Sequence, residues 1–186
     1  MDTRHREFAL LTVLLCVTRL SDLFATFLVT PNLARETNPL VSVLGQGWAW
    51  LIGVQVVLVS IIVLLNYYSL FKSKTEYPSE EGLSFQRFAT RYYLGREQHW
   101  VNLIFRLPYR WNVFVKVFGY TLPRVLIVVG LLVSVSSLLL SVSPTYANYY
   151  LPLPAFYAVF FAIALLIYYR FFQTEYVAYR RRSEGL

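Results

Sequence analysis

The chain has 186 residues and a mass of 21.7 kDa, with 57% hydrophobic and only 15% charged residues. Soluble globular proteins average roughly 45–50% apolar and about 25% charged residues. A small soluble domain keeps much of its surface in water, so it could not bury this much apolar side chain. The composition, with a mean hydropathy of +0.50, excludes a soluble enzyme, a disordered chain and a disulfide scaffold. It predicts an all-α membrane protein.

Basic residues exceed acidic ones, with 17 Lys and Arg against 10 Asp and Glu, for a net charge of +7. Membrane proteins collect such residues in the loops that stay on the cytoplasmic side. That rule accounts for the excess, and nucleic acid is not expected as a partner. The single cysteine, Cys16, excludes an internal disulfide.

Four apolar segments are long enough to cross a bilayer core about 30 Å thick. They cover about residues 8–29, 48–68, 122–142 and 151–171. Trp48 and Tyr68 bracket the second segment and lie about 30 Å apart along a helix, where interfacial aromatic residues are expected. The first segment exceeds the length of a signal-peptide core, so we expect it to remain uncleaved. The chain is thus predicted to form one four-transmembrane-helix bundle.

The basic residues predict the orientation of this bundle. They concentrate in both tails and in the middle loop, residues 71–121, whereas the other two loops hold only Arg35. Four spans place both tails and the middle loop on one side, which the positive-inside rule assigns to the cytoplasm. This charge pattern fits both a bacterial cytoplasmic membrane and an organellar inner membrane.

The middle loop mixes arginines with aromatic residues. This mixture predicts one or two amphipathic helices in the membrane interface, divided at Pro108, where rings enter the acyl boundary and cations meet anionic headgroups. A protein-docking surface is the alternative. The residues expected to contact lipid are Arg96, Trp100, Arg106, Arg110, Trp111 and Lys116.

The first span carries a polar face. Arg19 and Asp22 lie three residues apart, so they can pair on one side of a helix, and Thr26 continues the same face. A charge at this depth costs about 2.5–3.5 kcal/mol on insertion scales, so this face is predicted to point into the protein. Two interpretations remain open: a structural ion pair, or a site for a proton, an ion or a substrate.

A second polar group follows at Glu36, Asn38 and Pro39. Asn before Pro is typical of a helix start, and a carboxylate nearby is favoured by the helix dipole. Glu36 therefore acts as a capping residue or joins Asn38 and Asp22 around a polar ligand.

The string from Asp22-x-x-x-Thr26 to Glu36-x-Asn38-Pro39 resembles a group of small uncharacterised bacterial integral-membrane proteins, which have an Asp-x-x-x-Thr first helix and a Glu-x-Asn-Pro loop. The resemblance covers about residues 15–69. It implies that Asp22, Thr26, Glu36 and Asn38 act together and that the host is bacterial, and it implies no reaction.

The remaining spans carry weaker signals. Gln55 needs a polar partner inside the membrane, and a stripe of small residues on the third span is typical of close helix packing. The stripe consists of Gly130, Ser134, Ser137 and Ser141.

No nucleotide-binding, hydrolase or His/Cys metal pattern is present, so no catalytic residue, metal or cofactor is expected. The predicted function is a non-enzymatic integral-membrane subunit or scaffold, with other membrane subunits or a second copy as partners. The alternative is a small oligomeric transporter or channel, or a lipid-directed intramembrane enzyme, using the Arg19–Asp22 face and Glu36.

Overall fold

The computed structural model describes residues 2–29, 31–32, 47–74, 76–143, 145–146 and 153–183, and all regular structure in these ranges is helical. Four helices are long and apolar enough to cross a membrane, which confirms the predicted fold class. They are α1 (Thr3–Val29), α3 (Trp48–Tyr67), α6 (Trp111–Val142) and α8 (Leu153–Ser183).

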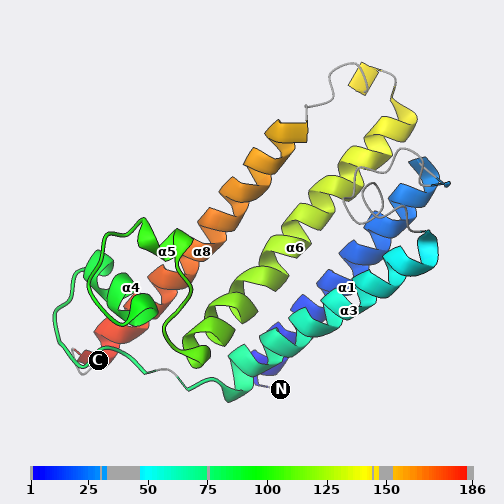
Figure 1. Ribbon diagram of the computed structural model, residues 1–186. Helices are drawn as coiled ribbons and strands as arrows, with labels where there is room; N and C mark the ends of the chain where they lie inside the picture. Colours follow the sequence, from blue (N-terminus) through cyan, green and yellow to red (C-terminus); the bar gives the residue numbers. More distant parts are fainter. Residues whose placement is uncertain are drawn as a thin grey trace.

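The four long helices run alternately up and down, and α6 lies at the centre of the arrangement (Figure 1). α1, α3 and α8 all pack against α6, and α1 also contacts α3. Both chain termini and the connection between α3 and α6 lie at the same end of the bundle (Figure 1). The described helices thus have the even number of crossings that the sequence predicted.

Three of the long helices extend beyond their predicted bounds, and the first of them, α1, begins at Thr3 instead of near residue 8. Residues 111–121, expected as loop, form the first three turns of α6, and α8 continues to Ser183 instead of ending near residue 171. Pro108 does lie between two helices, but the second is this extension of α6 and not a separate interfacial helix. The extensions of α6 and α8 pack on each other, with Lys116 Nζ 2.8 Å from Oε2 of Glu175, and this contact keeps both segments helical.

The connection between α3 and α6 begins with a π-helical turn, η1 (Tyr68–Lys72). There α6 approaches α3 so closely that a Cβ on Gly119 would collide with the Leu65 carbonyl oxygen and with Ser69. The Ser69 hydroxyl donates a hydrogen bond to the Lys116 carbonyl, at 3.1 Å. Glycine is therefore required at position 119 because any side chain would force the two helices apart.

The rest of the connection holds two short helices, α4 (Phe85–Leu94) and α5 (Asn102–Phe105). α4 is amphipathic, as predicted, but its apolar face packs on the lower end of α8 instead of entering lipid. We call this region, residues 76–121 with residues 168–183, the aromatic cap. Its centre is made of rings, chiefly Phe88, Tyr92, Tyr93, Phe171, Phe172 and Tyr179, all buried.

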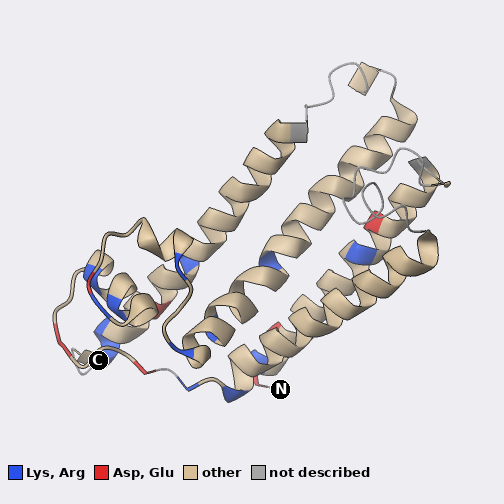
Figure 2. Cartoon of the chain, viewed as in Figure 1, with Lys and Arg blue, Asp and Glu red and all other residues tan. Residues whose placement is uncertain are grey.

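The charged residues follow this division of the molecule. Figure 2 shows that Lys and Arg gather at the end that holds the termini and the cap, whereas the upper half of α8 carries no charge. Within α8, no Asp, Glu, Lys or Arg occurs from Leu153 to Tyr169. The basic end of the bundle and the uncharged half of α8 are thus distinct parts of the molecule.

Candidate functional site

The predicted polar face of α1 is built around Arg19. One guanidinium nitrogen, Nη2, donates to the Leu126 carbonyl oxygen on α6 at 3.0 Å. The other, Nη1, lies 3.7 Å from Oδ2 of Asp22. Both side chains are largely covered, with exposed fractions of 14% and 20%. The guanidinium therefore links α1 to α6 through a backbone carbonyl, a contact that the sequence did not predict.

Gly130 on α6 makes this link possible. A Cβ at this position would collide with Nη2 of Arg19 and approach Cβ of Thr18 to 3.1 Å. Gly130 therefore has the predicted packing role, because its missing side chain leaves space for the guanidinium group of Arg19. Thr18, which sequence reasoning missed, is buried there and donates to the Leu15 carbonyl at 3.0 Å.

The other members of the predicted stripe differ in their surroundings. Ser134 is buried and Ser137 is half-buried. Ser141 is exposed, and its hydroxyl donates back to the Leu138 carbonyl of its own helix at 2.7 Å. The stripe therefore packs inside the bundle only at its lower end.

The remaining predicted site residues are only partly brought together. Thr26 on α1 and Gln55 on α3 are both half-buried. Glu36 and Asn38 lie outside the described residues, so their joint action with Asp22 and Thr26 stays a prediction.

A second polar link joins α6 to α8 at the edge of the cap. Lys116 Nζ lies 2.8 Å from Oε2 of Glu175, with exposed fractions of 15% and 11%. The Tyr77 hydroxyl donates to the same Glu175 oxygen at 3.1 Å. Lys116, predicted to contact lipid headgroups, instead points into the protein, because the extension of α8 places a carboxylate beside it.

The other predicted lipid-contacting residues lie on the surface. Arg96, Trp100, Arg106 and Trp111 are exposed, and Arg110 is half-exposed, forms an ion pair with Glu76 and lies over the Tyr109 ring. The neighbouring apolar side chains Phe105 and Leu107 are 79% and 72% exposed. Loop 100–111 thus presents the aromatic and cationic side chains that an interfacial segment requires.

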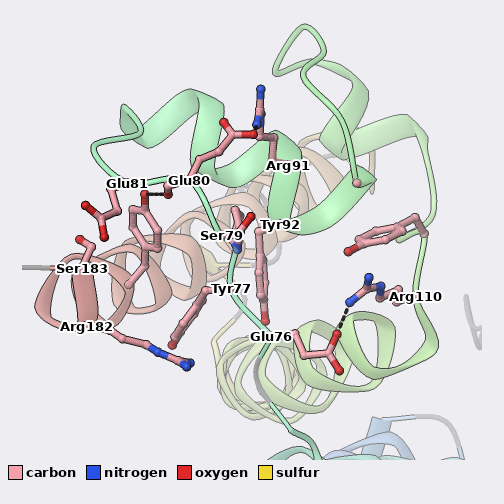
Figure 3. Close-up of a pocket in the computed structure, with 14 residues that line it drawn as sticks. Glu76, Tyr77, Ser79, Glu80, Glu81, Arg91, Tyr92, Arg110, Arg182 and Ser183 are labelled. Atoms are coloured by element: carbon pink, nitrogen blue, oxygen red, sulfur yellow. Dashed lines mark hydrogen bonds and ion pairs between the residues drawn. The ribbon is translucent and has the colours of Figure 1, made fainter.

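A polar pocket of about 810 Å³ opens in the aromatic cap between segment 76–81, α4 and the end of α8 (Figure 3). Its charges balance, with carboxylates and guanidiniums in equal number: Glu76, Glu80 and Glu81 against Arg91, Arg110 and Arg182. Arg91 forms an ion pair with Glu80. The Tyr179 hydroxyl donates to the Glu80 carbonyl and fixes the segment to α8.

The tyrosines of this pocket are neutral hydrogen-bonding groups. Burial raises the pKa of Tyr77 and Tyr92 well above the ordinary value, and the negative charge of Glu175 raises each pKa further. Both hydroxyls thus stay protonated and do not act as bases, and the Tyr77 hydroxyl donates its hydrogen bond to Glu175. Among the described residues, no group of three His, Cys, Asp or Glu side chains is placed to hold a metal ion.

Sequence reasoning missed this pocket. Its walls come from segment 76–81, which reads as a polar linker, and from residues 179–183, which read as a tail. Only the continuation of α8 brings them together.

Comparison with known proteins adds no assignment, since no protein-family model, no curated protein and no solved structure matches the chain. The function is therefore inferred from the geometry of the chain itself.

Proposed function

We propose that the chain is a non-enzymatic integral-membrane subunit or scaffold of a larger membrane assembly, and that the upper half of α8 binds a membrane helix of a partner. One observation carries the proposal. No described side chain from Pro154 to Arg170 is buried, whereas Phe171 and Phe172, the next residues, are almost completely buried. The described part of the chain therefore covers this half of the helix only partly.

The chemistry of that half fits a helix partner. Ala158 and Ala162 are exposed and four residues apart on one face. Small residues at this spacing let two helix backbones approach closely, which drives helix association in lipid. Aromatic rings flank them, with the centroids of Phe156 and Phe160 5.8 Å apart.

The buried charges support a structural role. Arg19 contacts Asp22 and the Leu126 carbonyl, Lys116 contacts Glu175, and Arg124 pairs with Glu7 across α6 and α1. Each of these cations joins two helices of the bundle or two turns of one helix. Such contacts hold the helices of the bundle together, as a structural role requires.

The location is part of the proposal. The basic end, with both termini, faces the cytoplasm, and the membrane is the bacterial cytoplasmic membrane. The shared position of the tails and the cap at one end of the bundle supports this orientation, as does the basic character of these segments.

The test is purification from the native membrane in mild detergent, comparing Ala158→Phe with Val57→Phe. Val57 lies on the outer face of α3 and is 57% exposed, so it is a matched control for bulk added to a lipid-facing helix. We expect a partner, or a second copy, at fixed stoichiometry with the parent and with the control, and its loss with Ala158→Phe. Recovery of the parent chain alone, as a monomer, would contradict the proposal.

A transport function is the second candidate, and one observation favours it. Five buried side-chain atoms on α1, α3 and α6 have no hydrogen-bond partner among the described residues: Thr12 Oγ1, Arg19 Nε, Asn66 Oδ1, Thr121 Oγ1 and Ser134 Oγ. Buried polar groups of this kind are commonly satisfied by water, and water is a medium for proton or solute movement. Solute flux in vesicles that is lost in Asp22→Asn, with the purified assembly intact, would replace the scaffold proposal with this one.

A further inference from the structure

Two adjoining grooves run along one face of α8, on the side that meets α4 and α5. They share Phe85 and Tyr169 as a common wall, and these two rings lie 5.5 Å apart. One groove is apolar and the other is basic. The two grooves meet at this ring contact, where α8 passes from its uncharged half into the aromatic cap, and we call the pair of grooves the channel.

The apolar groove has a volume of about 680 Å³. Its lining is almost entirely hydrocarbon, from Leu103, Ile104, Ala162, Leu165 and Leu166 among others. The Tyr168 hydroxyl donates to the Leu103 carbonyl at 2.8 Å and fixes α5 against α8. The groove begins at Ala162 and Leu166, which are exposed on the uncharged half of α8.

The basic groove lies further along α8. It is lined by Arg170, Gln173, Thr174 and Arg181, which recur at spacings of three, four and seven residues and therefore share one helical face. Both arginines are exposed, and neither takes part in an ion pair within the described part of the chain. Arg170 lies about 6 Å beyond Leu166 along the axis at 1.5 Å per residue.

We propose that this channel binds an anionic phospholipid, with an acyl chain in the apolar groove and its headgroup between Arg170 and Arg181. An acyl chain gains about 0.8 kcal/mol for each CH2 that it buries, and guanidinium groups bind phosphate through paired charged hydrogen bonds. A phospholipid joins these two chemistries in the order in which the channel presents them.

This site is distinct from the lipid contacts predicted for Arg96, Arg106 and Arg110, which lie in the connection between α4 and α6. It shares Ala162 with the face proposed for a partner helix, but the purified chain in vesicles of known composition tests it without that partner.

Trp100 lines the apolar groove and serves as the reporter. The reporter protein carries Trp48→Phe, Trp50→Phe and Trp111→Phe, so that only Trp100 fluoresces. It is placed in phosphatidylcholine vesicles that hold a small fraction of lipid with brominated acyl chains, either phosphatidylglycerol or phosphatidylcholine. We expect the brominated phosphatidylglycerol to be preferred about 25-fold over the brominated phosphatidylcholine in quenching Trp100, because each of the two arginines near the headgroup adds about a fivefold preference.

Arg170→Gln with Arg181→Gln is expected to make the two brominated lipids quench equally. The matched control, Arg6→Gln with Lys72→Gln, removes two exposed positive charges at the same end of the bundle and is expected to keep the preference. Equal quenching in the reporter protein itself, or loss of the preference in the control as well, would overturn the proposal.

A second variant tests the acyl chain separately. Ala162→Phe leaves both arginines in place and fills the exposed opening of the apolar groove, so it should bring quenching by brominated phosphatidylglycerol down to the phosphatidylcholine level. Unchanged quenching in this variant would place the chain outside the groove and overturn the proposal.

Discussion

The two halves of α8 differ in what covers them. From Phe171 onward, each turn down to Tyr179 contributes a buried residue to the aromatic cap, including Glu175. From Pro154 to Arg170, no described side chain is buried. The chain thus supplies its own cover for one half of the helix, and this cover sets the position of α8, while the other half is free to meet lipid or a partner.

The aromatic cap and the membrane-spanning part of the bundle are held together by different forces. In water, burying aromatic side chains is favourable by itself, and ring pairs add about 0.5–1.5 kcal/mol each. In lipid that driving force is missing, so helices associate through small residues and polar contacts. The Arg19–Leu126 link with Gly130 is such a contact, whereas the lower half of α8 is held mainly by rings.

The largest effect is expected for Phe88→Ala, which removes the most buried ring of the cap. Phe88 contacts the rings of Tyr92, Tyr176 and Tyr179. Loss of a buried Phe costs about 3–5 kcal/mol, and hydrogen exchange of the α4 amides should report that loss as faster opening of the cap. The control Phe105→Ala, at an exposed site, should stay within about 0.5 kcal/mol. Unchanged exchange in Phe88→Ala would show that the cap is not held by its rings.

A smaller loss is expected when the α6–α8 ion pair is broken. Lys116→Met leaves the carboxylate of Glu175 buried without its cation. The cost should be about 2–3 kcal/mol, below the full value for a completely buried pair because both groups keep some contact with water. The double variant Lys116→Met/Glu175→Gln should recover much of the thermal stability in detergent. If the loss of stability in the double variant equals the sum of the losses in the two single variants, the pairing is contradicted.

Gly130→Ala should destabilise the α1–α6 contact by about 1–2 kcal/mol, because the new methyl group displaces Arg19 from the Leu126 carbonyl. Thermal unfolding in detergent measures the loss. Gly53→Ala, where a Cβ meets nothing within 4 Å, is the matched control and should be neutral or stabilising. In an Arg19→Ala background the Gly130→Ala cost should shrink, and an unchanged cost would rule out the proposed clash.

The smallest effect at neutral pH is expected for Tyr92→Phe. Burial holds the pKa of Tyr92 above the ordinary value of 10.0, so the native cap keeps the proton that an unfolded chain loses. Stability from this group is therefore complete below pH 10 and falls as the pH rises above it. Tyrosinate absorbance should show that Tyr92→Phe unfolds at higher pH than the parent. Tyr68→Phe, at an exposed site, should unfold like the parent, and an unshifted Tyr92→Phe would contradict the burial argument.

The sequence predicted the membrane-spanning part of the fold well because hydropathy and helix length determine it. It predicted the ends of α6 and α8 less well. Residues 111–121 and 172–183 mix rings with charges, a composition that also suits an interfacial loop and a tail. What makes them helical is a contact between segments about 60 residues apart, such as Lys116 with Glu175, and no local pattern contains it.

The candidate site shows the same limit. The spacing of Arg19 and Asp22 indicated their pairing because neighbours on one helix follow from sequence alone. The acceptor on Leu126 and the space left by Gly130 belong to another helix, so they required the packing of α1 on α6. Asn66 is buried near the end of α3. It could have been chosen from the sequence as a site residue, because an amide at the end of an apolar span needs a hydrogen-bond partner.

Photocrosslinking from position 158 in the native membrane tests the central claim most directly. A photoreactive amino acid replaces Ala158 in one protein and Val57, on the outer face of α3, in another. The proposed assembly predicts one discrete protein adduct from position 158 and only lipid adducts from position 57. Lipid adducts alone from both positions would show that the upper half of α8 faces the bilayer, and the scaffold proposal would be wrong.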